Sequence, residues 1–447
     1  MLNIIINSFN FKEKLSLEKN PRLRLYYCLL IVIYIWLRIN FLLRVVRPFF
    51  KKEKFKEFAL KHHTKNARLL YRTILKLRGL FIKVGQFLSM RVDLLPSPYT
   101  KEFSKLQDQV PPHDFKEIEK RLREELGKIE EIFSEFEKEP IASASLGQVH
   151  RAKLKNGQIV AVKVQYPGIE KIVETDLKVL WIILRFFGLF RKNFQWKLLL
   201  DEFKEFVFLE LDYINEGKNA ERIKEDFRDT EWVVVPSVIW KFTTKRVLVL
   251  EYIDGIKVTH YPSYERIGIK REEVMKRVLD LYFRMIFSKG FFQADPHPGN
   301  IFVLPDGRIA LLDFGLSREI KKETIQGFGR MARAVAERNP EELAVAFEEI
   351  GFISLNGKTE GFRKFAEIVV RYAPHVVYKN PRALDLQEIS SEILELVRKY
   401  PLVRIPSDFL LMGRVMGLLL GLGKFLKAKV NVNEIVMKAL GGYNGST

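Results

Sequence analysis

The spacing of apolar residues changes along the chain and separates regions with different predicted structures. Between Ala67 and Pro96, apolar residues recur every three or four positions, which predicts one long amphipathic helix that stops at the proline. A second helix is predicted over Phe115 to Leu126, a segment rich in Glu and Lys. Helices therefore dominate the part of the chain that precedes residue 130.

Four segments with a period near two follow and predict strands. They cover residues 148–154, 158–167, 232–239 and 246–253. The first two are joined by Lys155-Asn156-Gly157, a sequence typical of a tight hairpin. These segments predict a small, sheet-rich part of the protein.

From about Ile269 the pattern is helical again, interrupted only by a hairpin over residues 300–315. A small sheet-rich lobe before a larger helical lobe predicts an α+β protein with two lobes. We expect an apolar and basic membrane-associating segment over 1–60, a helical extension over 61–135, an N-lobe over 136–255 and a helical C-lobe over 256–447.

The length and composition of the chain agree with two lobes, and its net charge points to a class of partner. The chain has 447 residues, of which 47% are apolar, and this is enough to bury more than one core. The single cysteine, Cys28, excludes an internal disulfide framework and is expected to be a buried or lipid-facing thiol. The net charge of +20 favours an anionic partner, which is nucleic acid, nucleotide phosphate or acidic lipid.

The basic excess is heaviest near the N-terminus, beside an apolar run. Leu25 to Leu37 has no charge but is too short to cross ~30 Å of hydrocarbon, whereas an extension to Leu43 is long enough. A cleaved signal peptide fits poorly, because charge follows the run without a small-residue cleavage site. Three interpretations stay open: a helix in the membrane interface, a spanning anchor, or a helix packed on the protein itself. In the first, acidic headgroups would bind Lys51, Lys52, Lys54 and Lys56.

A polar loop after a run of aromatic residues carries the strongest chemical signal. Asp295 and Asn300 have the spacing D-x-x-x-x-N, in which a carboxylate faces the attacking group and an amide oxygen reaches a metal ion. Asp313, which begins the sequence Asp-Phe-Gly, follows beyond the predicted hairpin, where a second carboxylate would bind Mg²⁺. Together they predict a kinase-type site for ATP and Mg²⁺.

The sheet-rich lobe supplies candidate groups for the nucleotide. Lys163, on the third strand of the lobe, is expected to bind the α- and β-phosphates. Residues 142–147 stand where a kinase has its glycine-rich loop, with alanines in place of the first two glycines, and would close less tightly on the phosphates. The adenine is expected at residues 250–253. The expected nucleotide-binding residues are Ala142, Ser143, Ala144, Ser145, Gly147, Lys163, Glu251 and Ile253.

Four motifs, in order, resemble the UbiB family of atypical kinases, also called ADCK or aarF-type proteins. They are K-V-G-Q over 83–86, A-S-A-S-L-G-Q-V-H over 142–150, E-L-D-Y-I-N-E-G-K-N over 210–219 and D-P-H-P-G-N over 295–300. The resemblance runs from about Arg68 to at least Arg318. It implies a bilobal protein kinase-like fold whose N-terminal helical extension packs over the active site.

The resemblance also assigns a partner to the nucleotide lysine. By position alone, Glu174 is a candidate for the glutamate that pairs with Lys163, whereas the resemblance implies Glu216. Gln293 replaces the histidine of an ordinary kinase loop, and we expect this replacement to remove a structural contact. His297 is expected to be structural, because no second His or Cys lies at ligand spacing.

Lys83 and Gln86 lie on one helical face. The resemblance implies that their helix closes the groove in which an ordinary kinase admits a peptide, with Lys83 reaching the carboxylates of Glu210 and Asp212. No A-P-E segment follows residue 315, and ordinary kinases use that segment to anchor a peptide-docking loop. Protein substrates are therefore disfavoured.

Near the C-terminus, Gly413, Gly417 and Gly421 are four residues apart in an apolar segment. Such a stripe permits close helix contact. We expect a buried helix of the large lobe, with a membrane-facing or self-association surface as the alternative. A homodimer stays open on this basis.

The resemblance implies a membrane-associated atypical kinase or ATPase that binds Mg-ATP and supports isoprenoid quinone (ubiquinone-type) biosynthesis. It would act on a lipid, a quinone precursor or another small molecule, or hydrolyse ATP. The alternative is a non-catalytic, nucleotide-regulated, lipid-binding scaffold for quinone-biosynthesis enzymes. The expected location is the cytoplasmic face of the inner or plasma membrane, on acidic lipids, with peripheral or N-terminal attachment. Nucleic acid is not expected, because the chain has no aromatic-basic platform.

Overall fold

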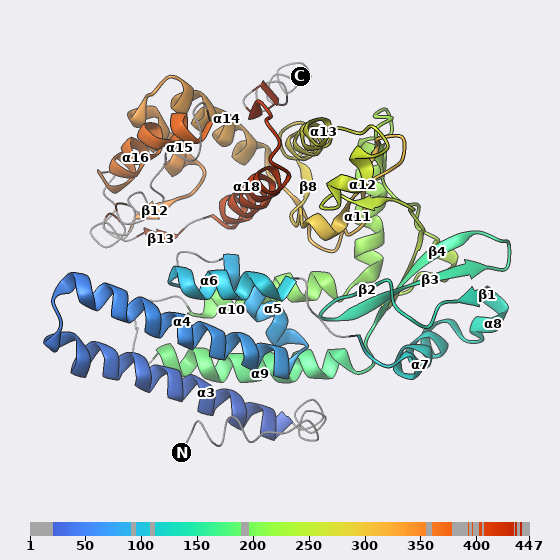
Figure 1. The fold of residues 1–447 in the computed structure, drawn as a ribbon, viewed down its shortest axis with the longest axis horizontal. Coiled ribbons are helices and arrows are strands. Elements are labelled where there is room, and N and C mark those ends of the chain that lie inside the picture. Colours follow the sequence, from blue (N-terminus) through green and yellow to red (C-terminus); the bar gives the residue numbers. More distant parts are fainter. Residues whose placement is uncertain are drawn as a thin grey trace. The chain divides into compact units, whose positions relative to one another are not determined.

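The computed structural model describes residues 21–90, 95–107, 112–188, 196–354, 360–377 and 406–432, and shorter pieces between 392 and 439. The chain divides into two compact units. The first contains Met1–Gly217 and Ser237–Tyr252, and the second contains Lys218–Pro236 and Ile253–Thr447. The two units are described separately below, with the element labels of Figure 1.

The first unit contains an antiparallel sheet with the order β1-β3-β4-β6, and β2 pairs with β3. Its strands are β1 (Phe133–Phe136), β2 (Ala142–Ser143), β3 (Gly147–Leu154), β4 (Ile159–Gln165) and β6 (Val247–Glu251). The predicted hairpin is confirmed, because Lys153 on β3 pairs with Ile159 on β4. The expected strand number of Lys163 is wrong: β1 and β2 were not predicted, and Lys163 lies on the fourth strand in chain order.

Helices form the remainder of the described first unit. They are α3 (Pro21–Phe41), η1 (Leu42–Val46), η2 (Arg47–Phe49), α4 (Lys52–Leu77), α5 (Leu80–Met90), α6 (Ser97–Phe103), η3 (Ser104–Gln107), α7 (Phe115–Leu126), α8 (Ile129–Ile132), α9 (Ile169–Gly188), α10 (Trp196–Glu210), η4 (Trp240–Phe242) and the start of α11 (Tyr213–Asp226). The predicted second helix is confirmed as α7. It begins where the Asp114 side chain accepts a hydrogen bond from the Lys116 amide, and it ends at Gly127, which has a positive φ.

The single long helix predicted before Pro96 is wrong. The structure has two helices, because Arg78 and Gly79 adopt φ values of 54° and 51° and turn the chain between α4 and α5. The end of α4 is held from a distant part of the sequence: Arg24 on α3 donates to the carbonyl of Leu77 over 2.6 Å. An interaction across 53 residues supplies the helix stop that the local pattern lacks.

Helix α3 packs on α4 and α9 of the same unit (Figure 1). Its inner face buries Tyr27, Cys28, Ile31 and Ile35 in the core that these helices share. Arg24, only 1% exposed, makes a bidentate ion pair with the equally buried Asp176 on α9. Among the described residues, the stretch Arg22–Phe49 is the one helical segment long and apolar enough to cross a membrane.

The described part of the second unit combines three small sheets with helices. Four strands have the order β5-β10-β9-β7, and β8–β11 and β12–β13 form antiparallel pairs. The strands are β5 (Val233–Val234), β7 (Ile256–Lys257), β8 (Phe291–Gln293), β9 (Ile301–Val303), β10 (Ile309–Leu311), β11 (Ser317–Glu319), β12 (Ile353–Ser354) and β13 (Leu402–Arg404). The helices are the end of α11, α12 (Tyr261–Glu265), α13 (Arg271–Phe283), η5 (Arg284–Lys289), η6 (Pro298–Asn300), α14 (Lys322–Ala336), α15 (Pro340–Glu349), α16 (Glu360–Val377) and α18 (Ser407–Leu426).

The predicted hairpin over 300–315 is confirmed as β9–β10. The strand predicted over 232–239 is wrong in extent, because only Val233 and Val234 form β5, which pairs with β10 in the second unit. Pro236 follows and cannot donate a backbone hydrogen bond to a ladder. The sheets β8–β11 and β12–β13 were not predicted, since their strands are too short to show a period.

Helix α18 packs on α13 through its larger apolar side chains. It buries Met412, Val415, Leu419, Leu422 and Leu426. The glycine stripe makes no close helix contact within the described residues, whereas the alternative of a membrane-facing or self-association surface stays a prediction. Gly413, Gly417 and Gly421 are exposed, and a Cβ atom added to any of them would meet no described atom within 4 Å.

Candidate active site

Lys163 and Glu216 form an ion pair in the first unit. The Nζ atom of Lys163 donates to Oε1 of Glu216 over 2.6 Å, and the side chains are 17% and 1% exposed. The ammonium also lies 5.1 Å from the ring centroid of Tyr213. The partner of Lys163 is therefore the glutamate that the resemblance implied, and not Glu174.

The position of this pair follows from the elements that carry it. Along β4, Val160, Val162 and Val164 point into the core, so the alternation of a strand turns Lys163 to the other face. Glu216 lies in the first turn of α11, whose start is capped by Asp212: its carboxylate accepts a hydrogen bond from the Asn215 amide over 3.1 Å. Asp212 thus positions the helix that carries Glu216.

The loop over residues 142–147 is tied to the sheet by Tyr166. The Tyr166 hydroxyl donates to the carbonyl of Ala144 over 3.1 Å and lies 3.0 Å from the Ser143 hydroxyl. Burial raises the pKa of Tyr166 to about 12, so this hydroxyl stays protonated. The Ala144 amide also donates to the carbonyl of Gly147, which closes a turn. Ser145 is buried within this turn, and its hydroxyl has no hydrogen-bond partner among the described residues.

The glycine of the loop is required by packing. A Cβ atom at Gly147 would lie 2.4 Å from the carbonyl oxygen of Val164 and 2.7 Å from the hydroxyl of Tyr213. Real Cβ atoms do not approach backbone oxygens so closely. The loop therefore keeps the glycine at its base, whereas alanine occupies the two earlier glycine positions.

Lys83 on α5 reaches Glu210 at the end of α10. Its Nζ atom donates to Oε1 of Glu210 over 2.6 Å, and the two side chains are 13% and 19% exposed. Gln86, one turn further, donates to the carbonyl of Leu106 over 3.1 Å. Gly85 permits this approach, since a Cβ atom there would lie 2.2 Å from a methyl carbon of Leu106. The contact between the K-V-G-Q and E-x-D motifs that the resemblance implied is present.

Glu251 lies at the end of β6, where the chain leaves the first unit. Its carboxylate accepts hydrogen bonds from the amide and hydroxyl of Ser237, at 3.2 and 3.0 Å. The second segment of the second unit begins at Ile253. The two residues expected beside the adenine therefore flank the point where the chain passes from one unit to the next.

In the second unit, one hairpin positions Asn300 and Asp313. Ile301 on β9 pairs with Leu311 on β10, and the Leu312 amide donates to the carbonyl of Asn300 over 3.1 Å. Asp313 follows directly, and its carboxylate accepts a hydrogen bond from the Gly315 amide over 3.0 Å. An amide oxygen and a carboxylate thus lie at the same open end of the hairpin. Two oxygen ligands from the protein are typical of a Mg²⁺ site, because Mg²⁺ takes its other ligands from phosphates and water.

Gln293 joins the two loops that carry the candidate carboxylates. Its amide nitrogen donates to the carbonyls of Asp295 and Asp313, at 2.7 and 3.2 Å, and its amide oxygen accepts from Tyr282. The expectation that Gln293 removes a structural contact is wrong, because the glutamine side chain makes three such contacts. His297 is also structural, as expected: its Nδ1 atom accepts a hydrogen bond from the Gly299 amide.

The sequence analysis missed a contact between Asp295 and α18. The Nη2 atom of Arg414 donates to Oδ1 of Asp295 over 2.9 Å. The Arg414 side chain is 6% exposed and that of Asp295 is 30% exposed. The signal available in the sequence was a lone arginine within an apolar helix, which marks a charge with a buried partner.

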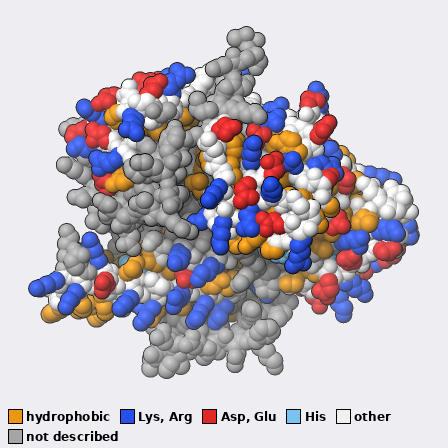
Figure 2. Space-filling model, turned by 45° about the horizontal axis from the view of Figure 1, so that its top comes forward, with side chains coloured by type: hydrophobic (Ala, Val, Ile, Leu, Met, Phe, Trp, Pro, Cys, Tyr) orange, Lys and Arg blue, Asp and Glu red, His pale blue; other side chains and the backbone are white. Residues whose placement is uncertain are grey.

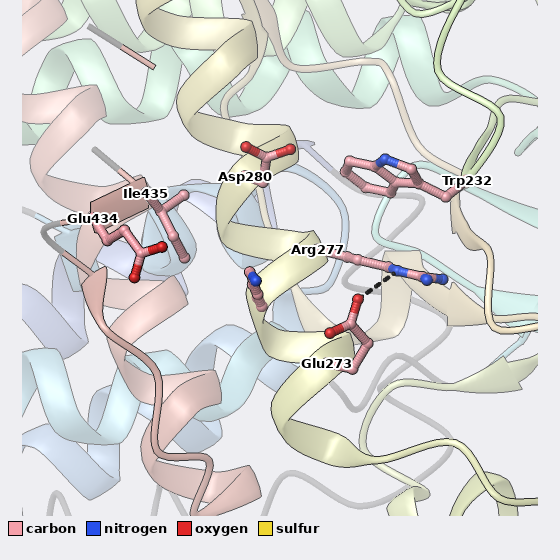
Figure 3. Close-up of a pocket in the computed structure, with 7 residues that line it drawn as sticks. Trp232, Glu273, Arg277, Asp280, Glu434 and Ile435 are labelled. Carbon is pink, nitrogen blue, oxygen red and sulfur yellow. Dashed lines mark hydrogen bonds and ion pairs between the residues drawn. The ribbon is translucent and has the colours of Figure 1, made fainter. Parts of the chain in front are cut away.

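A separate pocket of about 240 Å³ lies in the second unit. Glu273, Arg277 and Asp280 of α13 line it together with Trp232 and Glu434 (Figure 3). Arg277 and Glu273 form an ion pair of 3.1 Å across its wall. None of the expected site residues lines this pocket, so it does not locate the candidate active site.

The chain is similar to known proteins over most of its length. The ABC1 atypical kinase-like domain matches residues 105–346. The chain is 34% identical over 403 residues to Protein ACTIVITY OF BC1 COMPLEX KINASE 8, chloroplastic, of Arabidopsis thaliana, covering 83% of this chain and 53% of that protein. It is 38% identical over 275 residues to AarF domain-containing protein kinase 1 of Gallus gallus, covering 60% and 53%. The chain thus spans about half the length of these curated relatives.

The fold is also similar to that of solved structures. One of them is the complex of Rv3197 with erythromycin from Mycobacterium tuberculosis, which matches with a TM-score of 0.58 and 24% identity. The match covers 89% of this chain and 100% of that chain. The described helices and small sheets therefore form a known kinase-like architecture.

Proposed function

This chain belongs to the ABC1 atypical kinase-like family, the UbiB, ADCK or aarF-type group that its motifs resemble, and we propose that it is a membrane-associated enzyme that transfers or hydrolyses the γ-phosphoryl group of Mg-ATP. The observation that carries the proposal is the ion pair between Lys163 and Glu216. A buried pair of this kind contributes little to stability after the cost of desolvation. A lysine held by a helix glutamate is the device with which kinases bind the nucleotide phosphates.

Each candidate residue receives one task in this reaction. Lys163, oriented by Glu216, binds the phosphates of ATP. The carboxylate of Asp313 and the amide oxygen of Asn300 would hold Mg²⁺, which when bound would supply positive charge for the phosphate oxygens. The carboxylate of Asp295 accepts the proton of the attacking hydroxyl or water.

We propose that the acceptor is a small molecule, a lipid or water. The fixed contacts of α5 support this choice: Lys83 and Gln86 tie the helix to Glu210 and to the carbonyl of Leu106. A helix anchored at both positions is fixed within the first unit, and the family resemblance implies that this helix closes the groove in which an ordinary kinase admits a peptide. Among lipids, precursors of an isoprenoid quinone are the class that the family resemblance favours.

An apolar ridge on α3 supports membrane association. The ridge consists of Tyr26, Leu30, Ile33, Leu37 and Phe41, whose exposures range from 39% to 63%. Their spacing of three or four residues places them along one face. Exposed lysines follow at positions 51, 54 and 56. We infer that the ridge enters the interface of an acidic membrane while the lysines bind its headgroups.

The buried face of α3 favours a helix that lies flat. A spanning orientation would separate Arg24 from Asp176, and breaking a buried ion pair typically costs about 3–5 kcal/mol. It would also strip Tyr27, Cys28 and Ile31 from the core. The interface orientation keeps these contacts and buries only the exposed ridge.

Nucleic acid is not part of the proposal. On the face drawn in Figure 2, Lys and Arg side chains are interspersed with Asp and Glu side chains. One face of α4 does carry exposed basic side chains, which are Lys61, Lys65, Arg68 and Arg72. No described aromatic side chain of this helix is exposed, however, and a nucleic-acid platform would place exposed aromatic rings among the basic side chains for base stacking. The net charge of +20 is better matched to nucleotide phosphates and lipid headgroups.

The test uses the purified full chain with ATP and Mg²⁺, with and without vesicles that contain acidic lipid. Phosphate release and transfer of γ-³²P to a lipid extract are measured for the parent and for Lys163→Ala. We expect turnover that depends on Mg²⁺ and is lost in the variant. Lys153→Ala, on the neighbouring strand with its side chain 43% exposed, is the matched control. Nucleotide binding without turnover in the parent would favour the non-catalytic scaffold instead.

A further inference from the structure

The guanidinium of Arg414 is buried with two of its three nitrogen atoms unused. Its Nη2 atom donates to Asp295. The Nε and Nη1 atoms are enclosed and have no hydrogen-bond partner among the described residues. Arg414 lies on α18, beyond the residues that the family domain matches.

An arginine that served stability alone would be placed differently. Such an arginine usually donates two parallel hydrogen bonds to its carboxylate. Buried donors without acceptors are costly, and a buried charge is often replaceable by an apolar side chain without loss of stability. The unused nitrogens therefore indicate that Arg414 receives an anionic ligand.

Both members of the pair are fixed to the same helix, α13. Tyr282 of α13 holds Gln293, whose amide is bonded to the carbonyl of Asp295. Helix α18 packs on α13, and Arg271 of α13 donates to the carbonyl of Leu426 over 3.3 Å. The cation and the carboxylate are thus preorganised relative to each other, as a site for developing charge requires.

We propose that Arg414 is a catalytic residue that binds the phosphoryl oxygens beside Asp295 during transfer. The proposal rests on the proposed function and adds a cation from outside the matched domain. A planar guanidinium fits phosphate oxygens, and because its nitrogens share one carbon, Nη1 is adjacent to the Nη2 that holds Asp295. An arginine so placed stabilises the charge of the transferring group.

The step balances without a further reactant. The acceptor oxygen bonds to the γ-phosphorus, and the bond from that phosphorus to the β,γ-bridging oxygen breaks. ADP leaves with the electron pair, and the acceptor proton passes to Asp295. Arg414 keeps all its protons and forms only hydrogen bonds.

The kinetic test compares the parent with Arg414→Ala, Arg414→Lys and the control Lys424→Ala, whose lysine is exposed on the same helix. We expect kcat to fall by about 10²-fold or more in Arg414→Ala, with KM for ATP little changed. Arg414→Lys keeps part of the activity, and added guanidinium ion restores part of it to Arg414→Ala. Lys424→Ala behaves like the parent.

A binding test uses equilibrium dialysis of labelled ADP with Mg²⁺, with and without aluminium fluoride, and of labelled inorganic phosphate alone. Aluminium fluoride bound beside ADP mimics the phosphoryl group in the transition state of transfer. It should tighten ADP binding in the parent and in Lys424→Ala, but not in Arg414→Ala, while ADP alone binds all three equally. Arg414-dependent binding of phosphate without ADP would instead identify a free or acceptor phosphate as the source of the anion.

Parent-like turnover and parent-like ADP-fluoroaluminate binding in Arg414→Ala would overturn the proposal. If Arg414→Ala does not fold, Arg414→Lys decides, since full activity without a planar guanidinium would also overturn it. A parent chain that neither binds ADP nor turns over ATP disproves the proposed function. In that case the dialysis of labelled phosphate alone tests whether Arg414 binds an anion. If the parent does not bind phosphate, or if Arg414→Ala binds it equally well, the anion site at Arg414 is disproved.

Discussion

The hydroxyl of Tyr282 donates a hydrogen bond of 2.5 Å to the amide oxygen of Gln293, and both side chains are buried. Burial raises the pKa of Tyr282 well above its usual value, and the charges of Asp295 and Asp313 act in the same direction. The hydroxyl therefore remains a donor. It fixes which end of the Gln293 amide faces the carbonyls of the two candidate loops.

Tyr282→Phe should disturb both the fold and the reaction. The ring is kept, but the amide oxygen of Gln293 loses its buried donor, which costs about 1–3 kcal/mol of unfolding free energy. We also expect kcat to fall, because Gln293 can then rotate away from the carbonyls of Asp295 and Asp313. Urea unfolding and ATP turnover measure the two effects.

Tyr264→Phe is the matched control in the same unit. Tyr264 is fully buried, and its hydroxyl donates to the carbonyl of Val258 over 3.1 Å. This variant should lose stability and keep kcat. If Tyr282→Phe shows the same profile, Gln293 does not orient the loops.

Asp313→Asn and Asp295→Asn should differ in what they remove. The first loses a negative charge that would hold Mg²⁺, so Mg-ATP binding should fall. The second keeps binding and lowers kcat, because only the proton acceptor is lost. Calorimetric titration with Mg-ATP separates the two. Equal loss of binding in both variants would make Asp295 a metal ligand rather than the base.

The position of α3 on the membrane can be tested by charge and by extraction. Replacing Lys51, Lys54 and Lys56 by Gln should weaken sedimentation with acidic vesicles by about 1 kcal/mol per charge, and added salt should mimic the loss. Leu37→Glu, on the apolar ridge, should weaken it further. An equal number of substitutions at the exposed lysines 116, 120 and 128, on α7 and just beyond it, is the control.

Extraction with alkaline carbonate distinguishes the two membrane orientations. A helix that lies flat and keeps its contacts with α4 and α9 should be released. Retention in the membrane pellet, combined with vesicle binding that is unchanged when the lysines are replaced, would show that α3 crosses the bilayer.

His150 should make the first unit sensitive to acid. It is fully buried, its Nδ1 lies 2.8 Å from the carbonyl of Glu137, and its Nε2 lies 3.0 Å from the amide nitrogen of Gln148. Burial lowers the pKa of His150, although the Glu137 carbonyl and the carboxylates of Glu139 and Glu137 oppose the shift. The unfolded chain then binds the proton more readily than the folded chain.

Stability should therefore fall as the pH drops below about 6.5, the value for an unperturbed histidine, with a slope of at most about 1.4 kcal/mol per pH unit from this residue. His150→Asn should flatten the dependence of the thermal midpoint between pH 7 and 5. His260→Asn, at an exposed position, is the control. Identical pH profiles for the parent and His150→Asn would exclude His150 as the acid-sensitive group.

The sequence predicted those parts of the site whose residues are near neighbours in the chain. Asp295 and Asn300 share one loop, and the register of β9 and β10 brings Asp313 beside them. The spacing of these three residues along the chain was therefore enough to predict that they lie together. For Lys163, local spacing suggested Glu174, and only the family motif indicated Glu216, which lies 53 residues away in α11.

Contacts between distant segments account for what the sequence did not reveal. The helix break at Gly79 depends on Arg24, which binds the last carbonyls of α4 from another helix. The contact between Arg414 and Asp295 spans 119 residues. A lone arginine in an apolar segment indicates a buried partner but does not identify it.

The pair formed by Lys83 and Glu210 provides a test of the helix that carries the K-V-G-Q motif. Both side chains are mostly buried, so each single substitution, Lys83→Met or Glu210→Gln, breaks this ion pair and leaves one charge in a partly buried position. The double variant removes both charges together, so its cost should be smaller than the sum of the two single costs. We expect a coupling energy of about 0.5–3 kcal/mol in urea unfolding.

The exposed pair of Arg151 and Glu137, in the same unit, is the control for this cycle and should couple by less than about 1 kcal/mol. If the contact also holds α5 in place for the reaction, the single variants should lose lipid-stimulated turnover and begin to phosphorylate the chain itself. The reason is that a loosened helix admits peptide hydroxyls. Additive unfolding energies, together with no self-phosphorylation in either single variant, would show that this ion pair does not keep peptides out.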